Sequence, residues 1–137
     1  MTRRLRSAGR RGTVAVEFAV CGGLLMLLCG ATVNVSVLSW AEAALQSVAL
    51  QTARCAALGA AACPSPSQYA LTLVTQWLYS GAVSSSEIAV SSAAACNGAT
   101  GHYTVVTITA HAWSGSALVG PFAGTVLTAS ACYPSAL

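Results

Sequence analysis

The clearest pattern of apolar positions is an uncharged run from residue 18 to residue 41. These 24 residues would form a helix about 36 Å long, enough to cross a bilayer core about 30 Å thick. The run therefore predicts a membrane-spanning helix. A secretory signal peptide is the alternative, but its apolar region would be only about 7–15 residues long and would lead into polar mature sequence. Here the helical pattern continues beyond the run.

Beyond Trp40 the helical pattern becomes amphipathic. One face at 100° per residue is apolar apart from Thr52, and it consists of Leu38, Ala41, Leu45, Val48, Ala49, Thr52 and Ala56. Polar residues share the other, namely Glu42, Gln46, Ser47, Gln51 and Arg54. A single helix over residues 13–58 would be roughly 69 Å long, twice what a membrane needs. We expect its second half to be the spine of a separate domain, with Gly59 as its stop.

A second helix is predicted to begin at Ser65-Pro66, where a serine N-cap precedes a proline and Gln68 stands three residues after the cap. Gly81 is its expected end. Its apolar stripe consists of Ala70, Leu71, Val74, Trp77 and Leu78. We expect Trp77 to lie in the core.

The remaining chain is rich in serine, threonine and β-branched residues and predicts strands at residues 87–92, 103–112 and 125–131. The turn between the first two contains Asn97-Gly98 and Gly101, and residues 115–124 with Pro121 form a longer loop. The predicted class is α+β. It combines a long N-terminal transmembrane and spine helix, a short second helix, and an antiparallel three-stranded sheet packed on the spine helix.

Basic residues are concentrated before the apolar run. Five of the six lie there, namely Arg3, Arg4, Arg6, Arg10 and Arg11, and the sixth is Arg54. By the positive-inside rule the N-terminus stays cytoplasmic and the chain after about Ala41 is exported. The expected divisions are a basic leader (1–12), a transmembrane half-helix (13–41) and an exported α+β domain (42–137). Without the leader one arginine faces three glutamates, so nucleic-acid binding has no support.

Six cysteines are present, and two of them, Cys21 and Cys29, lie in the apolar run, where we interpret them as small packing residues. The other four would reach an oxidising compartment, where three pairings are open. We favour Cys55–Cys63 with Cys96–Cys132. A continuous helix would separate the α-carbons of the first pair by about 12 Å, and a disulfide tolerates under about 7 Å, so the helix must end between them.

Metal and enzyme chemistry have weak sequence support. A zinc site is the alternative use of the cysteines, but there is no CxxC pair, and neither His102 nor His111 stands at ligand spacing from a cysteine. An anchored enzyme would need a GxSxG, HExxH or carboxylate-pair motif, and none occurs. We therefore expect no metal, no cofactor and no catalytic residues, and we interpret both histidines as strand-surface residues.

Residues 10–18 read RRGTVAVEF and resemble the processing motif of TadE-like pseudopilins of the tight-adherence (Tad/Flp) type IV pilus system. Residues 44–59, ALQSVALQTARCAALG, resemble the alanine-rich helix end of that family, and residues 127–134, LTASACYP, its closing strand. The chain departs from the family at residues 21–23, CGG, and 32–36, TVNVS. Family members often carry a proline in the first region and an acidic-glycine pair in the second.

The resemblance implies that a prepilin peptidase cuts after Gly12, leaving Thr13 as the new N-terminus and Glu17 as its fifth residue. Glu17 and Phe18 would then be assembly residues, with the carboxylate of Glu17 paired to the Thr13 amine of a neighbouring subunit. It also implies a minor pilin, since major subunits of this system are smaller and lack a sheet domain. The expected location is a bacterial inner membrane, with possible incorporation into an extracellular pilus.

The partners that follow from this resemblance are other pilins, the peptidase, the inner-membrane assembly platform and membrane lipid. An uncleaved single-pass scaffold of pilus assembly is the alternative.

Overall fold

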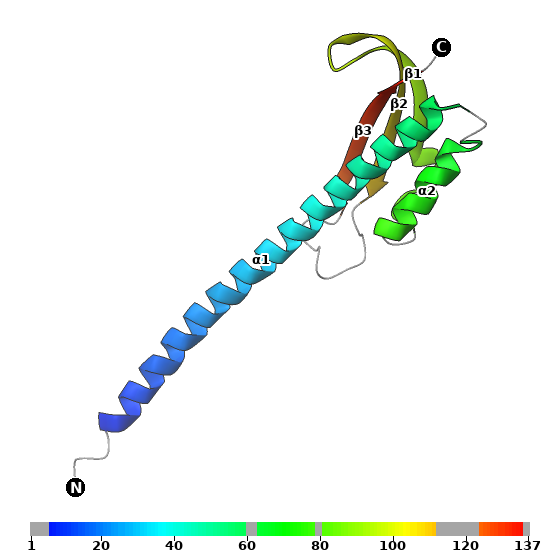
Figure 1. The fold of residues 1–137 in the computed structure, drawn as a ribbon. Coiled ribbons are helices and arrows are strands. Elements are labelled where there is room, and N and C mark those ends of the chain that lie inside the picture. Colours follow the sequence, from blue (N-terminus) through cyan, green and yellow to red (C-terminus); the bar gives the residue numbers. More distant parts are fainter. Residues whose placement is uncertain (1–5, 60–62, 79–80, 112–123, 136–137) are drawn as a thin grey trace. The chain divides into compact units, whose positions relative to one another are not determined.

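The computed structural model describes residues 6–59, 63–78, 81–111 and 124–135. Its elements follow the chain in the order α1 (Arg6–Ala57), α2 (Pro66–Trp77), a 3₁₀ turn η1 (Ser85–Glu87), β1 (Ile88–Cys96), β2 (Ala99–His111) and β3 (Val126–Pro134) (Figure 1). The predicted α+β class is confirmed. The expected loop over residues 115–124 lies almost wholly outside the described residues.

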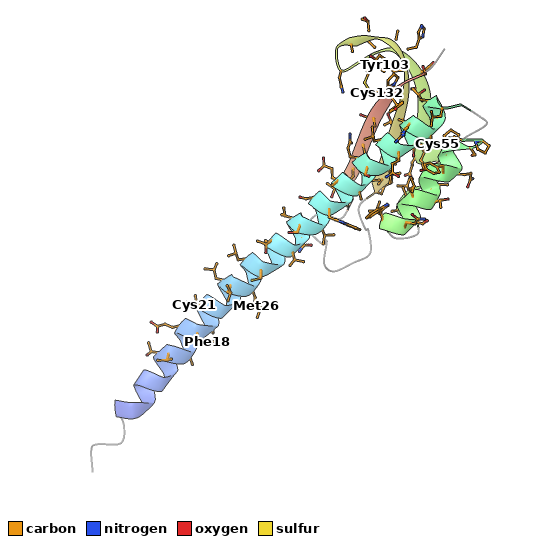
Figure 2. The ribbon with its side chains drawn as sticks, in the orientation of Figure 1. Phe18, Cys21, Met26, Cys55, Tyr103 and Cys132 are labelled. Atoms are coloured by element: carbon orange, nitrogen blue, oxygen red, sulfur yellow. A yellow bond between two sulfur atoms is a disulfide. The ribbon has the colours of Figure 1, made fainter. Side chains whose placement is uncertain are left out.

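Helix α1 has 52 residues and passes through both of the compact units into which the chain divides, Met1–Ser36 and Val37–Leu137. In the described part of the first unit, α1 is the only element, and its large apolar side chains are exposed. Figure 2 shows the side chains of Phe18, Cys21 and Met26 standing off this part of the helix. The apolar core therefore belongs to the second unit.

The second unit holds a three-stranded antiparallel sheet in the order β1-β2-β3. The hairpin between β1 and β2 turns at Asn97 (φ 47°) and Gly98 (φ 84°), the left-handed conformations that an Asn-Gly turn supplies. Gly101, expected in that turn, lies within β2 near a register shift between Ala93 and Ala95. Strands β1 and β2 thus extend beyond their predicted ends toward this hairpin, because pairing across it includes residues of low β propensity.

The core lies between the sheet and the two helices. Alternate residues of β2 face it, as expected for a strand with one buried face, and α1 contributes one stripe of its surface. The largest of its fully buried side chains are Leu45, Val48, Thr52, Val74, Val106 and Ile108. The polar face predicted for α1 is exposed in every position, and from it the Gln46 Nε2 atom donates a hydrogen bond of 2.9 Å to the Ser130 carbonyl of β3.

Helix α2 begins with Pro66, immediately after the extended N-cap residue Ser65, whose side chain makes no capping hydrogen bond. It ends at Trp77, before the expected stop at Gly81. Ala70 and Val74 are buried as predicted. The expectation that Trp77 lies in the core is wrong, because this residue is 50% exposed. It continues the stripe of Ala70 and Val74 but comes at the end of α2, one turn past its last buried residue.

Candidate functional site

Gly12, the residue expected before the processing point, lies inside α1 and is exposed. A Cβ atom placed on it would meet no atom within 4 Å beyond its chain neighbours and the adjacent backbone of its own helix. Its backbone is helical, so the conformational freedom of glycine is not used, and glycine lowers helix stability by about 1 kcal/mol relative to alanine. Packing within the described chain therefore gives no reason for glycine at this position.

Thr13, Glu17 and Phe18 are exposed on the same helix. Thr13 and Glu17 are four residues apart and so lie on one face, about one turn from each other. In the part of the chain that the structure describes, the Glu17 side chain has neither an ion pair nor a hydrogen bond. A carboxylate in an apolar setting needs a charged or hydrogen-bonding partner. For Glu17 that partner has to come from outside the described residues.

The helix around Glu17 is apolar on all sides. By length and composition, Gly12–Ala57 contains the one candidate membrane span among the described residues, and none of its most apolar window is buried. Cys21 and Cys29 are free and exposed, so neither side chain packs within the described chain. A helix that is apolar all round requires lipid or other helices as its surroundings. This long helix fits a membrane anchor.

Polar side chains near the end of the apolar run bond to their own helix. The hydroxyl of Thr32 donates to the Cys29 carbonyl at 2.9 Å, the Nδ2 atom of Asn34 to Gly30 at 2.7 Å, and the Ser36 hydroxyl to Thr32 at 2.8 Å. Such backbone bonds satisfy polar groups without water. Thr32 and Ser36 are therefore compatible with an apolar environment, whereas the Asn34 Oδ1 atom is buried without a hydrogen-bond partner among the described residues.

Two disulfides occur in the second unit. Cys55 and Cys63, with α-carbons 5.5 Å apart, join the last turn of α1 to the segment before α2. Between them α1 ends at Ala57, and Gly59 follows with a φ of 92°, the left-handed conformation common after a helix. Cys96 and Cys132, with α-carbons 6.4 Å apart, join the end of β1 to β3. Each disulfide therefore holds an element end that the core covers only partly.

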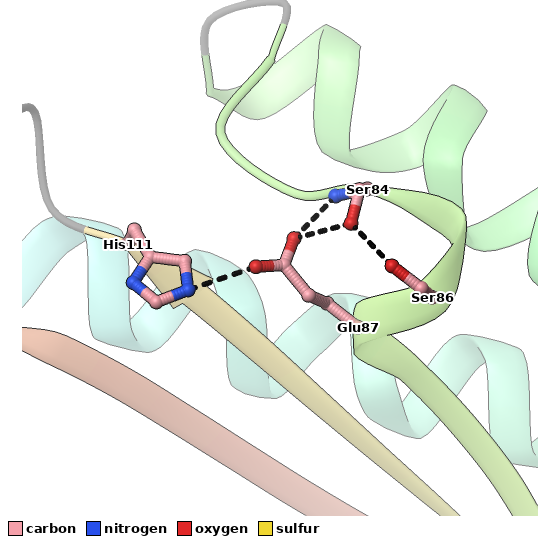
Figure 3. Close-up of polar contacts among 4 residues, drawn as sticks. All are labelled: Ser84, Ser86, Glu87 and His111. Atoms are coloured by element: carbon pink, nitrogen blue, oxygen red, sulfur yellow. Dashed lines mark hydrogen bonds and ion pairs between the residues drawn. The ribbon is translucent and has the colours of Figure 1, made fainter.

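A polar cluster lies where η1 meets β2 (Figure 3). The Oε2 atom of Glu87 accepts hydrogen bonds from the Ser84 backbone N–H (2.6 Å) and hydroxyl (2.8 Å), and its Oε1 atom lies 2.9 Å from His111 Nε2. Ser86 contacts the Ser84 hydroxyl at 2.9 Å. The Ser84 backbone and hydroxyl, and then His111, lower the pKa of Glu87 below its ordinary value. The cluster keeps Glu87 ionised and ties the end of β2 to η1.

The geometry of this cluster differs from that of a hydrolytic site. The Ser84 hydroxyl contacts Glu87 and Ser86, whereas a serine nucleophile needs a base such as histidine within hydrogen-bond reach. Among the described residues there is also no group of three or more histidine, cysteine or acidic side chains that could hold a metal ion. In this cluster the Glu87 carboxylate acts as a hydrogen-bond acceptor.

This cluster was not predicted from the sequence, although the sequence contains a pattern that indicates the contact between Ser84 and Glu87. Ser84 and Glu87 have the Ser-x-x-Glu spacing of a capping box, which predicts a turn start at Ser84. The contact to His111 joins residues 24 positions apart, so no local pattern reveals it. His111 is nevertheless a strand-surface residue, as expected, since its side chain is 61% exposed.

Among the described residues, one long apolar helix and a small disulfide-bonded α+β unit fit the class of membrane-anchored proteins. Residues 12–54 match the model of the TadE-like protein family, and this match confirms the resemblance predicted from the sequence. It includes Gly12, Thr13, Glu17 and Phe18, whereas the tail segment 127–134 lies outside it. No curated protein and no solved structure matches the chain.

TadE-like proteins are pilus components and are not known as enzymes. The match therefore indicates involvement in the Tad pilus system and association with its other components.

Proposed function

We propose that this protein is a minor pilin, or pseudopilin, needed to assemble a Tad/Flp-type pilus used in adherence or secretion. The observation that carries the proposal is Glu17, an exposed carboxylate without a partner among the described residues, placed just before an uncharged apolar run. It lies within the segment that matches the TadE-like family. A charge at the middle of a bilayer costs roughly 2.5–3.5 kcal/mol on insertion scales, so we expect a role that offsets this cost.

The first step of this function is processing. A prepilin peptidase cuts the bond after Gly12, and residues 1–12 are removed with all five N-terminal arginines. Those arginines first hold the N-terminus on the cytoplasmic side. Residues 13–41 then form the transmembrane half of the helix, and residues 42–137 form the exported domain. Without the cut, the arginines would keep the helix at the cytoplasmic face of the inner membrane.

The second step is assembly with other pilins on the inner-membrane platform. Cutting after Gly12 creates a new α-amine at Thr13, which carries a positive charge. In a bundle of apolar helices this amine pairs with the Glu17 carboxylate of a neighbouring subunit, and Phe18 packs beside the pair. Both charges are needed for this contact, because removing one of them leaves the other buried without a partner, at a cost of several kcal/mol.

Processing is tested by the N-terminal mass of the protein coexpressed with its cognate prepilin peptidase. Wild type should begin at Thr13, and Gly12→Leu should block the cut. Gly23→Leu is the matched control, because a Cβ at either glycine meets no atom within 4 Å, so both variants should fold equally well and only the second should be cut. A chain that still begins at Met1 in piliated cells would instead favour the uncleaved single-pass scaffold.

A further inference from the structure

Two half-exposed tryptophans lie together on the second unit, Trp40 from α1 and Trp77 from the end of α2, at 49% and 50% exposure. They line one cavity of about 190 Å³ with Ala43, Ala44 and Ser47. Exposed apolar side chains that lie together mark an interaction surface more often than apolar side chains that are scattered singly. The residues between the two tryptophans are small, so both indole rings remain accessible.

The direction of α2 explains how residues 37 positions apart in the sequence meet. Near its start, Tyr69 lines a separate groove of about 600 Å³ together with Arg54 of α1. At its end, Trp77 lines the cavity with Trp40. Helix α2 therefore runs back along α1, from the level of residue 54 toward the level of residue 40. This reversal carries Trp77 to the end of the uncharged run.

The place of Trp40 in the uncharged run indicates a bilayer surface as the partner of the two tryptophans. It is the second-last residue of the uncharged run, which ends at Ala41 before Glu42. Tryptophan is enriched where a membrane span meets the headgroup layer, because its ring is apolar and its N–H can bond to water or headgroups. Because Trp77 lines the same cavity, a bilayer surface at Trp40 also reaches Trp77. Helix α2 carries no charged residue, so its approach requires no charge to be desolvated.

We propose that Trp40 and Trp77 together form a membrane-interface anchor, which rests the C-terminal end of α2 on the outer headgroup layer of the phospholipid bilayer before the subunit enters a pilus. The inference rests on the membrane anchor proposed above. It adds a second point of contact from a different element. Two contacts fix the rotation of the exported unit about α1, whereas a single helix would leave this rotation free.

Depth-dependent fluorescence quenching tests this anchor in the full chain. The chain has three tryptophans, and Trp113 lies outside the described residues. Trp40→Phe with Trp113→Phe leaves Trp77 as the only tryptophan, and Trp77→Phe with Trp113→Phe leaves Trp40. Each variant is reconstituted into phosphatidylcholine vesicles whose chains are brominated near the headgroup. Both emitters should lose a similar large share of their emission and be shielded from aqueous iodide.

Two further probes, each in a background with all three tryptophans changed to phenylalanine, complete the design. Tyr69→Trp lies eight positions before Trp77, about 12 Å away along α2, and should keep its emission and remain open to iodide. Met26→Trp lies within the apolar run and reports on insertion of the span itself. It should be quenched by lipids brominated at mid-chain.

The outcomes separate the anchor from the proposed function. Quenching of Met26→Trp with no quenching of Trp77 overturns the tryptophan anchor and leaves the membrane span standing. Equal quenching of Tyr69→Trp and Trp77 also overturns it, because the contact would then involve all of α2. If Trp77 is unquenched in vesicles but shifts to shorter wavelength when another pilin is added, the occupant is protein rather than lipid. If Met26→Trp is not quenched, the membrane anchor fails and this inference falls with it.

Discussion

At the scale of single residues, Glu87 is the ionisable group among the described residues whose pKa departs clearly from its ordinary value. Its carboxylate accepts two hydrogen bonds from Ser84 and contacts His111, and the strongest cause of its lowered pKa is the Ser84 backbone N–H. A carboxyl group with a lowered pKa in the folded state stabilises that state fully above its unfolded pKa, here near 4.5. This stabilisation is lost as the pH falls through the lower folded value.

Glu87→Gln should therefore lower the thermal stability of the folded domain at pH 7, and the difference from wild type should shrink as the pH falls below about 4. Thermal unfolding in detergent, followed by the circular dichroism of the sheet, measures both values. Glu42→Gln is the matched control, because the side chain of Glu42 is exposed and has no partner among the described residues. A difference for Glu87→Gln that stays constant from pH 7 to pH 3 would contradict this account.

Thr52 is the one polar residue buried in the described core, with 0% exposure, and its hydroxyl has no hydrogen-bond partner there. An unsatisfied buried hydroxyl costs roughly 1–3 kcal/mol. Thr52→Val keeps the shape and removes the hydroxyl, so it should raise the free energy of unfolding by about 1 kcal/mol. Thr52→Ser, which keeps the hydroxyl and loses a methyl group, should lower it by about the same amount. Destabilisation by valine would show that this hydroxyl is bonded in solution.

At the scale of elements, the apolar run, the helical stripes and the segments rich in serine, threonine and β-branched residues were sufficient to predict two helices and three strands. Strand ends were less predictable: residues 93–96 have low β propensity and are strands because β2 pairs with them. The apolar stripe predicted for α2 includes Trp77, which is exposed. Periodicity shows which face of a helix is apolar, but it does not show how far along the helix that face is covered by the core. Glu17 was evident from the sequence as a charge at the edge of an apolar run. The contact between Glu87 and His111 was hidden because it depends on tertiary structure.

The two disulfides close loops of different length, so their loss should have different consequences. In the loop-entropy model Cys55–Cys63 contributes roughly 2.6 kcal/mol and Cys96–Cys132 roughly 3.8 kcal/mol. Cys132→Ser should therefore destabilise the folded domain more than Cys63→Ser in denaturant unfolding. Peptide mapping without reduction should recover only these two pairs. A peptide that links Cys63 to Cys96, or free thiols at these sites, would contradict the pairing.

At the scale of the whole molecule, the residues of the core and the residues proposed for processing and assembly belong to different units. The apolar core belongs to the second unit, whereas the exposed apolar residues of the first unit contribute to no core among the described residues. The first unit also contains Gly12, Thr13, Glu17 and Phe18, all of which are exposed. We therefore expect substitutions among these four residues to leave the fold of the second unit unchanged and to act on processing or on contacts with other pilins.

Glu17→Ala is the change that tests assembly most directly. It removes a charge from the edge of the span, so membrane insertion should be as good as in wild type or better. The bond after Gly12 is unchanged, so cutting should largely persist. Association with other pilins should fail, because the Thr13 amine of a neighbouring subunit would be left without its partner in an apolar setting, a loss of several kcal/mol.

Co-purification of the cut protein with the other pilins, measured side by side for wild type, Glu17→Ala and the control Glu42→Ala, is the decisive measurement. The account predicts that wild type and Glu42→Ala bring down the other pilins and that Glu17→Ala, although inserted and cut, does not. If Glu17→Ala is cut and assembles as well as wild type, Glu17 is not the assembly contact, and the proposed role of this carboxylate is wrong.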